Sequence, residues 1–145
     1  VRARNPEIGL PTDYIVGFPG ETDEQFAAGL KFVEQIGFSR MHIFRYSPRP
    51  GTPAASRKDH LDGKVKKARS ERAEVLWRGM AEAYHQRFVG RDLEVLWETN
   101  GNGVWQGVSR EYIPVRLEST RSDLQNQLSL VRVVLADSEG VTAIE

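Results

Sequence analysis

The feature that most constrains the fold is a strand, a glycine-rich turn and a helix start, packed into the stretch from Thr12 to Thr22. A short β-branched and aromatic run at 14–16 is typical of a buried strand. Glycine and proline at 17–20 end it, and Thr22 with Gln25 matches a capping box. Such turns lie beyond the carboxyl ends of strands, where ligands bind in α/β folds. An ordinary loop between a strand and a helix is the alternative interpretation.

The following pattern predicts a helix over 23–36 and a second strand over 40–46, which together imply a right-handed parallel crossover. A second rigid loop, 47–52, contains two prolines and a glycine, and we expect it beside the first loop at the same sheet edge. Two strands cannot form a stable parallel sheet, because such a sheet needs both faces covered. We therefore expect residues 1–58 to be the end of a larger α/β domain, or to pair with a copy of the chain.

A long basic helix is predicted over 62–88, with a buried face that includes Val65 and Ala68 and with Arg69 among its outward charges. From Arg91 the hydrophobic period changes to two. Asn100-Gly101 is a hairpin turn signal. Five short strands, at 93–98, 104–109, 112–117, 128–136 and 141–144, predict a small closed barrel. The fold class is thus α/β plus all-β, in three parts: 1–58, a linking segment 59–90, and the barrel 91–145.

Charge is segregated along a chain whose 20 basic and 20 acidic residues balance. The surplus of basic residues lies in 38–90, so only that part offers a polyanion a favourable field. The chain has no cysteine and three separated histidines, so we expect no metal site of its own. No apolar run approaches the ~20 residues of a membrane helix. The chain begins with Val1, which we take as the start of a fragment, and we expect a cytoplasmic location.

Three stretches together resemble the radical S-adenosylmethionine methylthiotransferases. They are Asp-Tyr-Ile-Val-Gly-Phe-Pro-Gly-Glu-Thr at 13–22, His-Ile-Phe-Arg-Tyr-Ser-Pro-Arg-Pro-Gly-Thr-Pro-Ala-Ala at 42–55, and a segment from Val95 to Asn126 that looks like a TRAM domain, a small tRNA-binding barrel. An arginine between prolines at 48–50 resembles the tRNA branches rather than the ribosomal-protein branch. The pair of His42 and Phe44 looks most like the enzymes that act on threonylcarbamoyladenosine beside the anticodon.

The resemblance implies a partial βα barrel, similar to a TIM barrel, that uses S-adenosylmethionine and two 4Fe-4S clusters to insert sulfur into a modified adenosine of tRNA. The cluster cysteines of that family do not occur in this chain. The chain is therefore expected to be the carboxyl-terminal part, to contain no catalytic residue or metal ligand, and to be inactive alone. Its expected partners are the tRNA anticodon stem-loop and the missing amino-terminal part of the same polypeptide.

By the same resemblance, four residues would border the cofactor: Ile15 and Gly17 under the adenine and ribose, with Phe44 and Tyr46 near the adenine. Plain core packing is the alternative for Ile15 and Phe44. Arg49 would meet a phosphate or carboxylate, unless it is a solvated loop arginine. Candidate RNA contacts in the barrel are Trp105, Arg110, Tyr112 and Arg116, since aromatics stack on bases and arginines meet phosphates. Trp97 and Trp105 also fit a barrel core.

Two other functions stay open. The acidic balance of residues 91–145 argues against a strong RNA-binding module, so the barrel could dock onto the parent enzyme or another protein. A stand-alone RNA-binding module without catalysis is the third interpretation. In each case we expect unequal stability, with residues 91–145 folding by themselves and residues 1–58 fragile or self-associated.

Overall fold

The computed structural model describes residues 3–5 and 7–145. These fall into two compact units, residues 10–77 and residues 1–9 with 78–145. The division lies within the long helix α2 (Gly63–Gln86), which the sequence analysis set apart as part of a linking segment.

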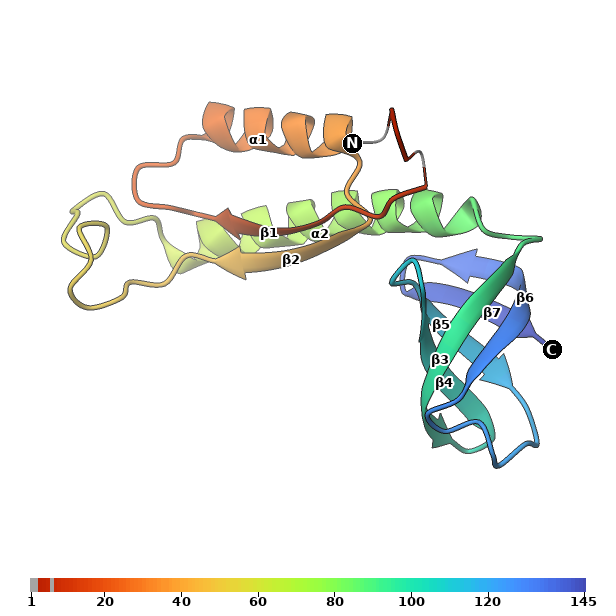
Figure 1. Ribbon diagram of the computed structural model, residues 1–145. Helices are drawn as coiled ribbons and strands as arrows, with labels where there is room; N and C mark the ends of the chain where they lie inside the picture. Colours follow the sequence, from red (N-terminus) through yellow and green to blue (C-terminus); the bar gives the residue numbers. More distant parts are fainter. Residues whose placement is uncertain (1–2, 6) are drawn as a thin grey trace. The chain divides into compact units, whose positions relative to one another are not determined.

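The first unit is a parallel pair of strands, β1 (Pro11–Val16) and β2 (Arg40–Arg45), joined by α1 (Asp23–Ile36). Figure 1 shows α1 and the first half of α2 with these two strands. The predicted crossover is confirmed. The chain supplies two strands in this unit, so the partial βα barrel that we expected is not seen in the described residues.

Helix α1 begins and ends where its sequence signals predict. The Gln25 amide donates to Thr22 Oγ1 at 3.2 Å, and Gln25 Oε1 accepts from the Thr22 amide at 3.0 Å. This reciprocal pair satisfies two amides that the first helical turn leaves free. Gly37 ends the helix with φ 64°, a left-handed conformation that glycine adopts without strain.

A small cluster holds this unit together. Val16 from β1, Phe26 from α1 and Ala73 from α2 are buried at its centre. Partly buried Tyr14, Leu30 and Ile43 pack around them. Because successive side chains of a strand point to opposite faces, the other face of β1 and β2 is left without helices on it.

The second unit is built around a closed barrel of five strands: β3 (Asp92–Gly101), β4 (Val104–Ser109), β5 (Pro114–Glu118), β6 (Leu128–Asp137) and β7 (Gly140–Ile144). Their order is β3-β4-β5-β7-β6 (Figure 1). The pairs are antiparallel except that β5 runs parallel to β7. The predicted barrel is confirmed, and closure leaves it no free sheet edge.

The barrel interior is filled by alternate residues of every strand. Trp97 and Val133 are fully buried, and Phe88 of the segment after α2 joins the same core. The indole Nε1 of Trp97 donates to Ser129 Oγ at 2.7 Å, so its one polar atom is satisfied inside. The interpretation of Trp97 as a core residue is confirmed.

Two sequence predictions about the barrel turns are wrong. The first hairpin turns at Asn102-Gly103, where φ is 55° and 82°, and not at Asn100-Gly101. Gly101 still pairs with Val104 across the two-residue turn, which fits the positive φ values that a type I′ turn requires. The predicted strand at 112–117 begins two residues later, because Tyr112 lies in the preceding turn with φ 61°.

The buried face of α2 also differs from the prediction. Val65 is 39% exposed and Ala68 is exposed, whereas Arg69 is only 5% exposed. The helix turns Arg69 and Ala73 toward the core of the first unit, because Arg69 has carboxylate partners there. The outward placement of Arg69 was therefore wrong.

Candidate functional site

The loops that follow β1 and β2 lie side by side, as the sequence predicted. The Tyr46 amide donates to the Val16 carbonyl at 2.9 Å, which joins the ends of the two strands. The Gly20 amide donates to the Asp59 carbonyl at 2.9 Å, so the segment after the second loop returns to the first. Asp59 is itself ion-paired to Arg57. The carboxyl edge of this sheet is thus a connected rim, at the place where α/β folds bind ligands.

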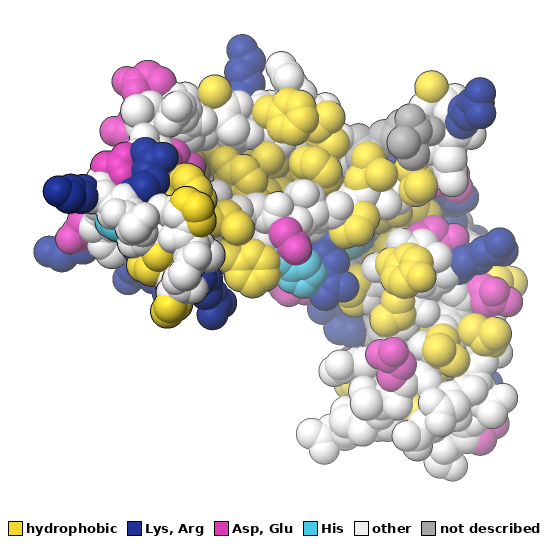
Figure 2. Space-filling view, turned by 60° about the vertical axis from the view of Figure 1, so that its left-hand side comes forward, with side chains coloured by type: hydrophobic (Ala, Val, Ile, Leu, Met, Phe, Trp, Pro, Cys, Tyr) yellow, Lys and Arg dark blue, Asp and Glu magenta, His cyan; other side chains and the backbone are white. Residues whose placement is uncertain are grey.

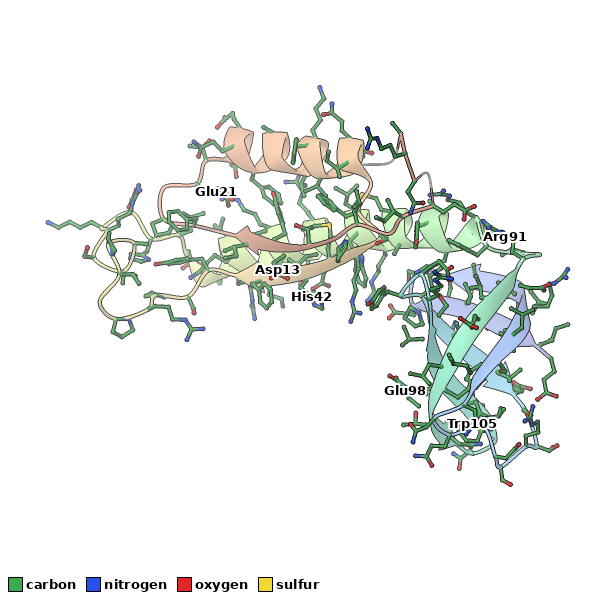
Figure 3. All side chains as sticks on the ribbon, in the orientation of Figure 1. Asp13, Glu21, His42, Arg91, Glu98 and Trp105 are labelled. Carbon is green, nitrogen blue, oxygen red and sulfur yellow. The ribbon has the colours of Figure 1, made fainter. Side chains whose placement is uncertain are left out.

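The helix-free face of the two strands carries a pair of large apolar side chains. Ile15 and Phe44 are register partners and are 54% and 51% exposed, so neither is a core residue of the described unit. Asp13 and His42 form the neighbouring register pair (Figure 3). The His42 ring stacks on Phe44 with centroids 6.5 Å apart. Hydrophobic side chains gather over this part of the chain in Figure 2. This face could receive a flat aromatic ring.

Gly17 is buried and has φ 73°. A Cβ atom on Gly17 would lie 2.3 Å from Lys66 Cγ, so the space beside it is filled by a side chain of α2. Lys66 continues past it and donates to the Tyr46 carbonyl at 3.2 Å. Glycine is required here by the backbone conformation and by Lys66, and not by the position under the adenine and ribose that the resemblance implies.

Tyr46 lies between two other rings of the rim. Its ring meets Phe18 edge-on at 5.2 Å and lies 5.8 Å from the ring of His60. Its hydroxyl is buried and has no hydrogen-bond partner in the described structure. Buried polar atoms in native proteins almost always have a partner, so the hydroxyl of Tyr46 is a hydrogen-bonding group that a ligand atom at this rim can satisfy.

A buried arginine forms ion pairs beneath the first loop. The Glu21 carboxylate accepts from the Gly17 amide at 2.8 Å and from Arg69 of α2. Arg69 also donates to the Glu21 carbonyl at 3.0 Å and to Asp23 Oδ1 at 2.7 Å. Burial alone lowers the pKa of Arg69, but the hydrogen bonds to Asp23 and Glu21 outweigh it and raise the pKa above its ordinary value. Sequence reasoning missed this contact, because Glu21 and Arg69 are 48 residues apart in the chain and no local pattern links them.

In the barrel, the turn between β4 and β5 holds an aromatic ring out in solvent. Tyr112 is 83% exposed although its φ is positive. The turn is closed by a bond from the Ser109 amide to the Ile113 carbonyl and one from the Tyr112 amide to the Ser109 carbonyl, each 2.9 Å. Ile113 is fully buried and anchors the turn in the core. Backbone strain combined with an exposed ring is typical of a functional position.

The barrel's arginines differ in whether they are paired. Four of the five pair with carboxylates: Arg91 with Glu7, Arg116 with Asp137, Arg121 with Asp123 and Arg132 with Asp92. Arg110, two residues before Tyr112, is exposed, and no ion pair involves it among the described residues. The cation and the ring of this turn are therefore both available.

The other candidates are placed differently. Trp105 is 3% exposed and its Nε1 donates to the Arg121 carbonyl at 2.9 Å, so it is a core residue and offers no ring face to a base. Arg116 is already ion-paired. Arg49 is exposed in the second rim loop, where its carbonyl accepts from Thr52 Oγ1 at 2.8 Å.

No group of three or more His, Cys, Asp or Glu side chains is placed to hold a metal ion among residues 3–5 and 7–145. Within the same residues, neither helix combines the length and the apolar character that crossing a membrane requires.

No protein-family model matches the chain. The chain is similar to the tRNA-2-methylthio-N(6)-dimethylallyladenosine synthase of Bartonella tribocorum, with 39% identity over 124 residues. The match covers 84% of this chain and 27% of that enzyme, so the chain spans about a quarter of the length of this curated relative. The similarity supports the resemblance to methylthiotransferases and does not decide the branch.

Proposed function

We propose that the chain is the carboxyl-terminal part of a radical S-adenosylmethionine methylthiotransferase that acts on tRNA. The observation that carries this proposal is the 39% identity to a named tRNA synthase, which extends over 84% of the chain and thus over both units. The order of the elements adds support. A strand-end rim of an α/β unit is followed by a small closed barrel, the arrangement that the three sequence signatures imply.

The first unit contributes the edge of the cofactor pocket in this proposal. The exposed pair of Ile15 and Phe44 fits the flat apolar face of an adenine, and the free hydroxyl of Tyr46 fits a polar atom of a nucleoside. Gly17 acts by shaping the rim. When bound, S-adenosylmethionine would supply the radical that removes a hydrogen from the substrate, with clusters held by cysteines outside this chain. The residues of this chain bind and orient, and none is proposed as a catalyst.

The second unit contributes tRNA contacts. We place them at the turn between β4 and β5, where Tyr112 can stack on an unpaired base and Arg110 can meet a phosphate. Trp105 is left out because it is buried, and Arg116 is secondary because Asp137 already neutralises it. The acidic balance of the barrel limits the affinity of this unit alone, so a modest and salt-sensitive affinity follows.

The branch stays a prediction. His42 and Phe44 favour the enzymes that act on threonylcarbamoyladenosine, whereas the name of the curated relative specifies dimethylallyladenosine. His42 is exposed on the helix-free face next to the proposed adenine position, where a residue could distinguish substrates.

Nucleoside analysis tests the proposal and the branch together. The full polypeptide that contains this chain is expressed in a bacterium that lacks its own tRNA methylthiotransferases, and its digested tRNA is analysed by mass spectrometry. We expect a 2-methylthio derivative of threonylcarbamoyladenosine. The dimethylallyl derivative would retain the family and reject the branch. Neither product, from soluble protein with its clusters in place, would reject the proposed function.

A docking role is the second candidate, because the barrel has an exposed apolar group. Leu96 and Leu128 are register partners on β3 and β6, and they are 41% and 64% exposed, with Leu130 beside them at 67%. In this alternative the barrel binds the upstream part of the same polypeptide. Titration of an anticodon stem-loop into the chain distinguishes the two, because only phosphate contacts give an affinity that falls steeply with salt.

A further inference from the structure

A buried arginine of α2 reaches the loop that borders the proposed cofactor site. The side chain of Arg69 is 6% exposed and that of its partner Glu21 is 15% exposed. Two nitrogens of the guanidinium donate to the residues on either side of the helix cap, Thr22. Nη1 donates to the Glu21 carbonyl, and Nη2 donates to Asp23 Oδ1. A planar fork can hold both positions at once, and a lysine ammonium cannot do so with the same geometry.

The same Glu21 oxygen that accepts from Arg69 also accepts from the Gly17 amide. Gly17 is the residue at which the chain leaves β1, and its backbone is left-handed. The direction of its amide therefore depends on the carboxylate, and the position of the carboxylate depends on Arg69. No other hydrogen bond of the Glu21 carboxylate is found among the described residues.

We propose that Arg69 is a positioning residue for cofactor binding, because through Glu21 it fixes the conformation of the loop from Gly17 to Glu21. This inference rests on the proposed function, which makes that loop a border of the S-adenosylmethionine pocket. Arg69 does not itself contact the cofactor. Its effect is on affinity, since the exposed pair of Ile15 and Phe44 presents the right surface only when the adjoining rim is in place.

The chain offers a matched control on the same helix. Arg72 lies one turn from Arg69, and both guanidinium groups lie over the ring of Phe26. The Cζ atom is 5.3 Å from the ring centroid in Arg69 and 5.1 Å in Arg72. Arg72 is exposed and makes no hydrogen bond to the loop in the described structure. The variants Arg69→Gln and Arg72→Gln thus remove the same charge and the same ring contact. Only the first removes the clamp, by which we mean the hydrogen bonds of Arg69 to Glu21 and Asp23.

The first measurement is made on the 145-residue chain and needs no cofactor. Amide hydrogen exchange at Gly17 is followed in the wild type, in Arg69→Gln and in Arg72→Gln. We expect exchange to accelerate by about tenfold or more in Arg69→Gln and to stay unchanged in Arg72→Gln, because only the former leaves the amide without an oriented acceptor. Unchanged exchange in Arg69→Gln would overturn the clamp. If that variant does not fold, Glu21→Ala replaces it, with the same expectation, because it removes the acceptor itself.

The second measurement uses the full polypeptide with its clusters in place. The dissociation constant of S-adenosylmethionine is expected to rise about tenfold or more in Arg69→Gln, to rise less in Arg69→Lys, and to stay within about twofold in Arg72→Gln. The values refer to folded, cluster-loaded protein, so a simple loss of stability does not move them. Equal affinities in Arg69→Gln and Arg72→Gln would overturn the positioning role.

The failure of the proposed function has a different result. In that case the cluster-loaded wild type shows no affinity for S-adenosylmethionine, and the positioning role is rejected with it. The exchange data at Gly17 would still report whether the clamp exists.

Discussion

The exposed Tyr112 yields a prediction with two effects of opposite sign. A non-glycine residue in the left-handed region costs about 1–2 kcal/mol. Replacement by glycine removes that strain. Glycine is also more flexible in the unfolded chain, and the loss of this freedom on folding destabilises the barrel by about 0.5–1 kcal/mol. Because the Tyr112 side chain is 83% exposed, little buried area is lost. Tyr112→Gly is therefore expected to stabilise the barrel by up to about 1.5 kcal/mol.

The same change is expected to weaken RNA binding. Stacking of a base on an aromatic side chain is worth about 1–3 kcal/mol. The dissociation constant of an anticodon stem-loop should then rise by about 5-fold to 150-fold. A residue whose removal stabilises the fold and weakens binding is present for the binding.

Fluorescence anisotropy with a labelled stem-loop measures the affinity, and urea unfolding followed by the fluorescence of Trp97 and Trp105 measures the stability. Asn102→Gly is the matched control, because Asn102 also has a positive φ, 55°, in the adjoining hairpin turn. We expect it to change neither quantity much, since asparagine tolerates this region.

Two results would refute this reasoning. Unchanged RNA affinity in Tyr112→Gly would remove the turn between β4 and β5 from the proposed tRNA surface. A loss of stability would mean that the exposed ring makes a contribution that its position does not indicate. An equal loss of affinity in Asn102→Gly would point to a general effect on the barrel.

Further predictions concern the fold of each unit. Gly107→Ala should lower the free energy of unfolding of the barrel by about 1–3 kcal/mol, because the added Cβ would lie 2.4 Å from the Leu96 carbonyl oxygen. The control is Gly101→Ala, where an added Cβ meets no atom within 4 Å, and it should leave the urea midpoint nearly unchanged. The hydrogen bond from Arg57 lowers the pKa of Asp59 to about 2. The stability that this ion pair contributes is therefore fully present above the unfolded pKa of 3.8, and it is lost as the pH falls through about 2. A carboxyl titration by NMR should show this low midpoint, and Arg57→Ala should return it toward the ordinary value. Limited proteolysis should cut residues 1–58 before the barrel, since the first unit has a small core cluster; a resistant first unit would contradict this.

Local sequence signals predicted most of the secondary structure. The capping box at Thr22 and the glycine at 37 set both ends of α1, and the period-two pattern after Arg91 gave all five barrel strands. The sequence analysis placed the first hairpin turn at Asn100-Gly101, and this was wrong. Asn102-Gly103 carries the same turn signal, and the cross-strand pairing of Gly101 with Val104 selects it.

The site depended on contacts that no periodicity reveals. Arg69 belongs to a charged run that is typical of a solvated helix face, and only the fold brings the partly buried Glu21 carboxylate to it. Tyr112 precedes a strand and fits its pattern, but the bonds that Ser109 makes with Tyr112 and Ile113 turn it outward. Trp105 has the residue type of an RNA contact and the position of a core residue, and strand register decides between them.

A chimeric enzyme tests most directly whether this chain is the carboxyl-terminal part of a tRNA methylthiotransferase. The matching 124 residues of the Bartonella enzyme are replaced by the corresponding residues of this chain, and the tRNA of a strain that depends on the chimera is analysed. Our account predicts that a 2-methylthio-adenosine derivative is formed, and that Tyr112→Gly in the chimera reduces it. A folded chimera that holds its clusters, binds tRNA and yet forms no such product would contradict the account.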